Sequence, residues 1–145
     1  MSQKRRVVVT GMGIVSPVGN TIAQAWDNIV NGRSGIGPIT GFDCSAYNTR
    51  IAGEVRDFDP TTFVSPKDAK KMDPFIHYGL AASMMALQDS GLEITDANAE
   101  RIGTYIGSGI GGLPGIEEGH SAFLKGGPRR LTPFFVPRSI INMVS

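Results

Sequence analysis

Three residues of this chain have side chains that could serve as a nucleophile and its bases: Cys44, His77 and His120. A thiol becomes a useful nucleophile when a base, or the start of a helix, favours its thiolate form. Cys44 lies in an irregular segment with no strand-to-helix turn, and His120 lies in a glycine-rich stretch that we expect to be a loop. We therefore predict surface or packing roles for all three, and no catalytic or metal-binding residue among them.

Gly107, Gly109 and Gly112 have the spacing of a dinucleotide-binding loop and follow an apolar segment. Such glycines let the backbone approach a pyrophosphate at a helix start. However, the residues after Gly112 do not have the pattern of a clean amphipathic helix. Arg129 and Arg130 stand about where an acidic residue should bind the ribose. We favour a turn shaped for close packing or for another ligand, and keep a nucleotide-binding oxidoreductase as the weaker alternative.

Basic side chains form two groups in the sequence. Lys67, Lys70 and Lys71 precede a predicted helix, and Arg129 and Arg130 form a second pair. Such groups are usually a solvated face, and they can also attract an acidic partner. The residues alone leave both interpretations open.

The elements that must position these residues begin with Val7–Thr10, a β-branched run that predicts a strand buried on both faces. Asn20 is the expected N-cap of a helix that ends before Gly32, with its apolar face formed by Ile22, Trp26, Ile29 and Val30. Residues 35–66 are expected to be irregular.

Asp73 followed by Pro74 predicts the start of a helix that runs to about Ser90 and stops at Gly91. Residues 101–106 predict a second strand, and the glycine loop follows directly. Strand, helix, long insertion, helix, strand and loop in this order predict a layered α/β protein.

Composition narrows the functional classes. The chain has 145 residues, is 41% hydrophobic and has a net charge of +1, which argues against a general nucleic-acid or membrane-surface binder. Its apolar runs fall short of the roughly 18 residues of a membrane-spanning helix. The amino-terminal residues lack the apolar stretch of an export signal, and a single cysteine excludes an internal disulfide. We expect a cytoplasmic protein.

Several longer strings are distinctive when taken together and in order. They are VVVTGMGIVSPVGN from Val7, KMDPF from Lys71, IGSGIGG from Ile106, GGPRR from Gly126, PFFVP from Pro133 and NMV from Asn142. This series resembles the opening of the β-ketoacyl-acyl carrier protein synthases, and within them the type II enzymes that elongate chains in bacterial fatty-acid synthesis. The resemblance covers essentially the whole chain.

The resemblance implies part of a thiolase-like layered α/β fold, working as a homodimer without a cofactor. It implies that an acyl chain moves onto a cysteine and condenses with malonyl-acyl carrier protein, with loss of carbon dioxide. In the family, the cysteine and two histidines that do this follow the Asn142–Val144 string. Residues 1–145 are therefore expected to form the N-terminal part of a ketoacyl synthase N-terminal domain, truncated before the catalytic cysteine, with no catalytic residue of their own.

The resemblance also assigns binding roles. Ile110 matches a residue that lines the acyl pocket, and Phe135 matches one offered to that pocket across the dimer interface. Ordinary core or interface packing remains an equal alternative for each. The residues that match the family's positive surface for the acidic acyl carrier protein are Lys67, Lys70, Lys71, Arg129 and Arg130. Residues 131–145 are then expected to face the dimer partner.

An alternative of another class is a short, non-catalytic paralogue that binds acyl carrier protein or a synthase subunit. In either case the isolated chain should be prone to self-association and only marginally stable, because half of a layered sheet leaves apolar faces uncovered.

Overall fold

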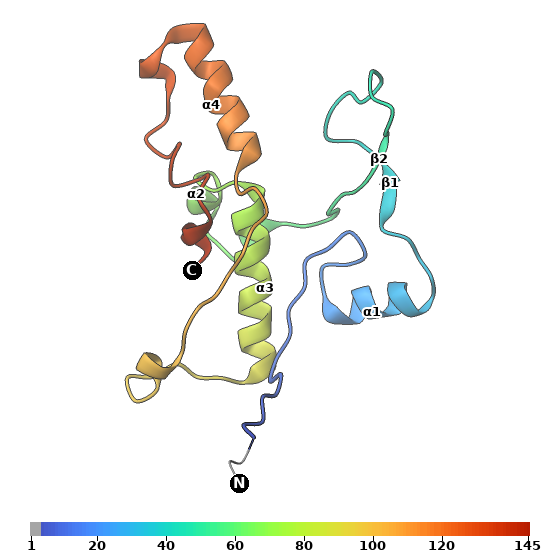
Figure 1. The fold of residues 1–145 in the computed structure, drawn as a ribbon, viewed down its shortest axis with the longest axis vertical. Helices are drawn as coiled ribbons and strands as arrows, with labels where there is room; N and C mark the ends of the chain where they lie inside the picture. The colour runs from blue at the N-terminus through green and yellow to red at the C-terminus, as the bar shows by residue number, and fades with distance from the viewer. Residues whose placement is uncertain (1–3) are drawn as a thin grey trace. The chain divides into compact units, whose positions relative to one another are not determined.

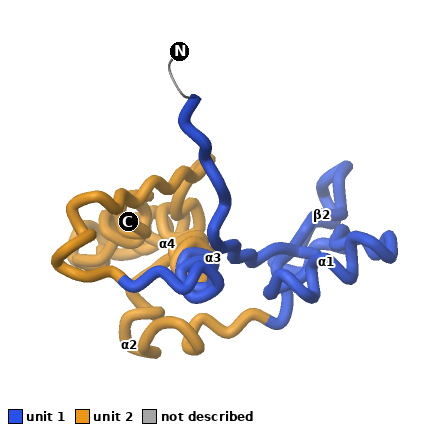
Figure 2. Tube along the Cα trace, turned by 90° about the horizontal axis from the view of Figure 1, so that it is seen from below, with its two compact units in different colours: residues 1–57, 82–93 blue, residues 58–81, 94–145 orange. Residues whose placement is uncertain are grey.

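The computed structural model describes residues 4–145 (Figure 1), which divide into two compact units (Figure 2). The first unit contains residues 4–57 and 82–93, and the second contains 58–81 and 94–145. The elements in chain order are α1 (Ile22–Val30), β1 (Ile36–Pro38), β2 (Ile51–Gly53), η1 (Pro60–Thr62), α2 (Pro66–Ala69), α3 (Pro74–Ser90), η2 (Ala99–Arg101), α4 (Leu113–Gly126), η3 (Pro128–Arg130) and η4 (Ile141–Val144). Within residues 4–145, no helix is both long and apolar enough to cross a bilayer.

Helix α1 forms as predicted, but its N-cap is Thr21 and not Asn20. The Thr21 side chain accepts a hydrogen bond from the backbone N–H of Gln24. The Asn20 amide instead donates to the Arg56 carbonyl at 2.7 Å, so tertiary contact takes this side chain away from capping. The predicted apolar face is present without a cover, since Trp26 is 66% exposed.

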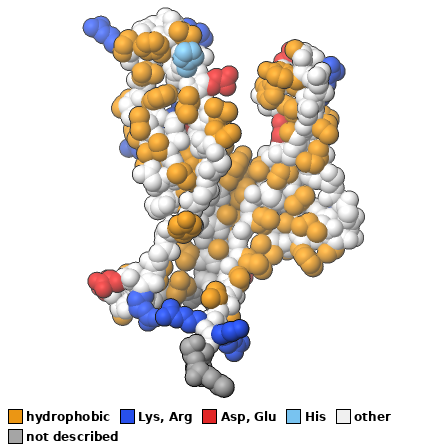
Figure 3. Space-filling view, viewed as in Figure 1, with side chains coloured by type: hydrophobic (Ala, Val, Ile, Leu, Met, Phe, Trp, Pro, Cys, Tyr) orange, Lys and Arg blue, Asp and Glu red, His pale blue; other side chains and the backbone are white. Residues whose placement is uncertain are grey.

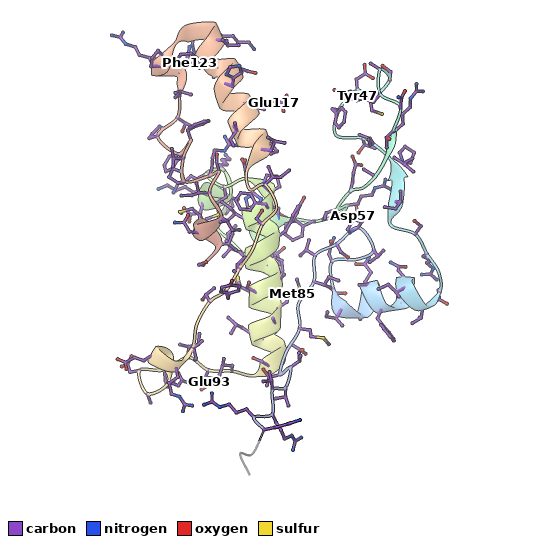
Figure 4. All side chains as sticks on the ribbon, viewed as in Figure 1. Tyr47, Asp57, Met85, Glu93, Glu117 and Phe123 are labelled. Carbon is purple, nitrogen blue, oxygen red and sulfur yellow. The ribbon has the colours of Figure 1, made fainter. Side chains whose placement is uncertain are left out.

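Strands β1 and β2 pair antiparallel in the first unit, with Gly37 opposite Ala52. The prediction of an irregular segment was wrong here, because strands of three residues containing glycine and proline show no readable alternation. Glu54 holds the start of the connection between them. Its carboxylate accepts hydrogen bonds from the N–H and hydroxyl of Thr40 and from the N–H of Gly41. Tyr47 lies further along the same connection (Figure 4).

Helix α3 has the bounds that the sequence predicted, and Gly91 follows it with a φ of +61°. In the first unit its second half is approached closely by the amino-terminal segment. A Cβ atom at Gly11 or Gly13 would overlap the α3 backbone around Ala82 and Ala86. The Met12 N–H donates to the Asp89 carboxylate at 2.8 Å, which fixes this approach.

Residues 7–10, predicted as a buried strand, and residues 101–106, predicted as a second strand, form no strand in the part of the chain that the structure describes. A strand requires backbone partners on a neighbouring strand, and neither segment has one here. Val7, Val8 and Val9 are 94%, 67% and 79% exposed. β-branched composition thus identifies strand-forming residues without supplying the neighbours that they need.

The second unit contains a helix that the sequence prediction missed. α4 begins directly after the glycine loop and includes His120, which was expected in a loop. Proline is well tolerated in the first helical turn, where Pro114 lies, so it did not mark the end of helical structure. The helix glycines Gly115 and Gly119 serve close contacts described below.

Candidate functional site

A small apolar recess lies between the glycine loop and residues 139–141 of the second unit. Its volume is about 280 Å³, and its lining residues are Ser108, Gly109, Ile110, Gly111, Ser139, Ile140 and Ile141. The Gly112 N–H donates to the Ser139 carbonyl at 3.1 Å, which joins the two walls. Ile110 is 73% exposed at the mouth. The geometry suits an apolar group of a few carbons.

A second recess of about 330 Å³ adjoins the first, because Ser108 and Ile141 line both. Tyr78 of α3 contributes to its wall and packs edge-on against Phe58, with ring centroids 5.2 Å apart. Burial raises the pKa of the Tyr78 phenol, so the group stays neutral at ordinary pH. The residues that line the two recesses carry no charge.

Phe135 lies elsewhere in the same unit. Its ring occupies the space beside Gly119 of α4, where any side chain would collide with it. It borders a third recess of about 240 Å³ that is otherwise lined by Ile116, His120, Phe123 and Leu131. The two predicted substrate residues, Ile110 and Phe135, therefore line different recesses of the described chain. The prediction that Phe135 acts across a dimer interface stays a prediction.

The basic residues form two separate groups. Lys71 pairs with Asp68 at 2.7 Å and lies 5.6 Å from the Phe134 ring centroid, while Lys67 and Lys70 are exposed. The hydrogen bond from Lys71, followed by that from Ser65, lowers the pKa of the Asp68 carboxyl. This group lies close to the start of α4, since the nearby Asp73 binds the first turn of that helix.

The second basic group lies at the far end of α4. Arg129 and Arg130 form η3, and the Arg130 stem packs over Gly126, the last residue of the helix. Lys125 in the last turn of α4 joins them, although the sequence prediction did not include it. Cations are favourable at a helix C-terminus. With a rise of about 1.5 Å per residue, α4 separates the two groups by about 20 Å.

The sequence prediction also missed a buried ionic cluster. Asp73 is 0% exposed, and its carboxylate accepts hydrogen bonds from the Gly115 N–H at 2.8 Å and from Arg138 Nε at 2.8 Å. Glu118 also binds Arg138, at 2.9 Å. Burial lowers the pKa of Arg138, but bonding to Asp73 and then Glu118 raises it overall. The predicted capping residue of α3 thus supports α4 instead.

The surface or packing roles of Cys44, His77 and His120 stay predictions. Cys44 lies in the β1–β2 connection of the first unit. In the second unit, His77 hydrogen-bonds the Ala69 carbonyl through Nε2 at 3.0 Å, and His120 borders the third recess. Among the described residues, no group of three or more histidine, cysteine or acidic side chains could hold a metal ion.

The glycine loop is used for packing. Gly111 has a φ of +79°, and a Cβ atom there would lie 2.6 Å from the Ser139 carbonyl oxygen, while one at Gly112 would lie 2.7 Å from the Arg138 carbonyl oxygen. The Gly111 N–H donates to Ser108 Oγ and the Gly112 N–H to the Ser139 carbonyl. These two donors are already occupied, which favours the interpretation of a packing turn over that of a pyrophosphate cradle.

Comparison with known proteins agrees with this geometry. Residues 4–145 match the family described as Beta-ketoacyl synthase, N-terminal domain. The 3-oxoacyl-[acyl-carrier-protein] synthase 2 of Vibrio harveyi is 60% identical over 142 residues, which are 98% of this chain and 34% of that protein. The Staphylococcus aureus (strain N315) protein of the same name is 43% identical over 145 residues, 100% of this chain and 35% of its own length. The chain spans about a third of these relatives.

Solved structures extend the likeness to three dimensions. The ishigamide ketosynthase/chain length factor superposes with a TM-score of 0.79 at 30% identity, over 99% of this chain and 36% of its own. A type II polyketide ketosynthase, solved in complex with its acyl-carrier protein, superposes with a TM-score of 0.75 at 24% identity, over 97% of this chain and 37% of its own. The predicted fold class, part of the thiolase-like layered α/β fold, is confirmed. The chain belongs to the β-ketoacyl synthase family, and residues 4–145 match the N-terminal domain of that family.

Proposed function

We propose that the protein carrying this chain is a 3-oxoacyl-[acyl-carrier-protein] synthase, an acyltransferase that elongates acyl chains in fatty-acid biosynthesis. The observation that carries the proposal is the 60% identity to the Vibrio harveyi synthase over 98% of this chain. The chain spans about a third of that relative, and the catalytic cysteine and histidines are proposed to lie outside residues 1–145. Residues 1–145 then contribute binding surfaces.

The chemistry follows from the family resemblance. The cysteine thiolate attacks the acyl thioester, so that a new thioester forms and the carrier thiol leaves. Malonyl-acyl carrier protein loses carbon dioxide, and the resulting carbanion attacks the cysteine-bound acyl carbonyl. The new carbon–carbon bond forms as the cysteine leaves, while histidine donors stabilise the charge on oxygen. We propose no cofactor for these steps.

Ile110 is the proposed contact to the acyl chain within residues 1–145. The recess that it borders is apolar, and its volume of about 280 Å³ suits part of a hydrocarbon chain. Phe135 is proposed to reach the same pocket of a second subunit in a homodimer. The exposed apolar side chains Leu131, Phe134, Val136 and Ile140 support such an interface. Figure 3 shows further hydrophobic side chains, in orange, at the surface of α4.

The acyl carrier protein is the proposed macromolecular partner. The cytoplasm is the proposed location of the protein. The supporting observations are the two exposed basic groups and the complex in which a related ketosynthase was solved with its carrier protein. Electrostatic attraction of this kind speeds association and weakens with salt.

The test uses the complete gene product incubated with acyl- and malonyl-acyl carrier protein, with mass spectrometry of the carrier-bound products. A 3-oxoacyl product two carbons longer than the acyl donor, with release of carbon dioxide, is the expected result. Binding of both carriers without product would overturn the enzymatic proposal and support the non-catalytic paralogue. Matched incubations without acyl donor measure uncoupled decarboxylation.

A further inference from the structure

One buried carboxylate joins three segments of the second unit. Asp73 precedes α3, yet its oxygens bind α4 and the segment after it: Gly115 N–H at 2.8 Å, Arg138 Nε at 2.8 Å and Arg138 Nη2 at 2.7 Å. Arg138 Nε and Nη2 converge on one oxygen, Asp73 Oδ1, which fixes the direction of the guanidinium as well as its distance. The carboxylate is fully buried, so solvent offers no substitute for these donors.

The glycines around Asp73 leave the space that its carboxylate occupies. A Cβ atom at Gly112 would collide with Asp73 Oδ2, and one at Gly115 would lie 2.6 Å from the same oxygen. Gly112, the N-cap residue of α4, has no side chain with which to satisfy the first N–H groups of that helix. Asp73 supplies the missing acceptor, and its charge suits the amino end of a helix.

The same cluster holds both walls of the Ile110 recess. On one side, Gly111 and Gly112 end the loop that carries Ile110, whereas Cβ atoms at Gly107 and Gly109 would meet no described atom within 4 Å. On the other side, Arg138 directly precedes Ser139, which lines the recess and accepts the Gly112 N–H. The anchored end of the loop and the opposite wall therefore share one ionic pair.

We propose that Asp73 and Arg138 are positioning residues that set the width of the Ile110 recess and through it the preference for acyl-chain length. The proposal rests on the proposed function, because it takes the recess to hold the acyl chain. Neither residue lines the recess, so each acts through the loop and the wall that it holds.

Three variants of the complete gene product distinguish a role in positioning the recess from a general contribution to stability. Asp73→Asn keeps the size and removes the charge, and Arg138→Lys keeps the charge and loses the two-bond geometry. Glu118→Gln is the matched control, because it removes only the exposed arm of the cluster, a carboxylate that is 70% exposed. Thermal unfolding of each variant identifies any that fail to fold.

The measurement is KM and kcat for a short and a long saturated acyl-carrier donor. Misplacement of about 1 Å costs up to about 100-fold, so we expect the long-to-short KM ratio to change about tenfold in Asp73→Asn, with kcat for the short donor kept. Arg138→Lys should change the ratio less, and Glu118→Gln should leave it as in the wild type. An unchanged ratio in a folded Asp73→Asn protein would overturn the proposal.

Equilibrium binding of free fatty acids of increasing length gives a readout that does not need condensation. A wild type that forms no 3-oxoacyl product overturns the proposed function. The positioning role then stands if the Asp73→Asn change still shifts the length dependence of binding, and it falls if the shift is absent. If Asp73→Asn does not fold, the same comparison is made with Arg138→Lys.

Discussion

The side chain of Val144 occupies the space in which a Cβ atom of residue 79 would lie. Its Cγ1 is 2.6 Å from the ideal Cβ position on Gly79, and Val144 is itself buried. This contact brings η4 against α3 within the second unit and closes one side of the second recess. A glycine in the middle of a helix, normally unfavourable, is explained by this approach.

The change Gly79→Ala tests this contact through the sign of its effect on the free energy of unfolding. Alanine is favoured over glycine in a helix by about 1 kcal/mol, so at an open helix position the change would stabilise. Here the new methyl group collides with Val144, and we expect a loss of about 1–3 kcal/mol in the free energy of unfolding. Urea unfolding of the complete gene product measures it. The double variant Gly79→Ala/Val144→Ala should recover part of the loss, and a Gly79→Ala protein more stable than the wild type would contradict the contact.

Charge reversal tests the two basic groups separately. We expect Lys67→Glu/Lys70→Glu and Arg129→Glu/Arg130→Glu each to weaken carrier-protein binding roughly fivefold to tenfold at low salt, because exposed ionic contacts contribute up to about 1 kcal/mol each. The effect should shrink as salt is added. Calorimetric titration with acyl carrier protein at two ionic strengths is the measurement.

The matched control for charge is Lys4→Glu/Arg5→Glu, an equal change of four charges at two exposed residues of the amino-terminal segment. If this control weakens carrier-protein binding equally, the effect is explained by net charge and not by the two basic groups. If only one of the two groups responds, the carrier protein contacts one end of α4 and not both.

The β1–β2 connection should loosen in acid. Hydrogen bonds from the backbone and hydroxyl of Thr40 lower the pKa of Glu54 below its ordinary value of 4.5. A carboxyl with a lowered folded pKa contributes stability above its unfolded pKa and loses it as pH falls through the folded value. The protection of the Thr40 and Gly41 amides, measured as exchange relative to the intrinsic rate at each pH, should therefore fall below about pH 4.5. Glu54→Gln should show low protection already at neutral pH, and a protection that does not change with pH in the wild type would refute the effect.

Residues 1–145 alone should unfold without a sharp transition. The buried apolar side chains of the described residues are Ala25, Ile76, Ala81 and Val144, a small core for a chain of this length. We expect strong binding of a hydrophobic dye and self-association in sedimentation experiments. A cooperative thermal transition from a monodisperse monomer would show that these units are sufficient by themselves.

The two main helices show what local sequence can predict. α3 was predicted with its correct bounds, because a proline start and a glycine stop are local signals. α4 was missed because Gly115, Gly119 and Pro114 obscure its apolar periodicity, and their compatibility with a helix depends on neighbours elsewhere. Val7–Thr10 was predicted as a strand from its composition, but pairing is not a local property.

The same distinction applies to the residues of the candidate site. The glycine loop and Ile110 could be identified because a distinctive string contains them. The function of Asp73 could not, since its partners Gly115 and Arg138 are 42 and 65 residues away in the sequence. Asp73 followed by Pro74 has a complete local explanation as a helix start, and that explanation concealed the longer-range one.

The uncovered Val7–Val9 segment has a consequence for biosynthesis. These residues are exposed in the described structure and pair with no neighbouring strand there. This chain spans about a third of the length of its relatives. In a protein of that length, at about 5–20 residues per second, translation of the rest takes on the order of tens of seconds. The segment stays exposed for that time. Exposed apolar residues and unpaired strands favour aggregation, so slower translation of the remainder would lengthen the period in which nascent chains can aggregate.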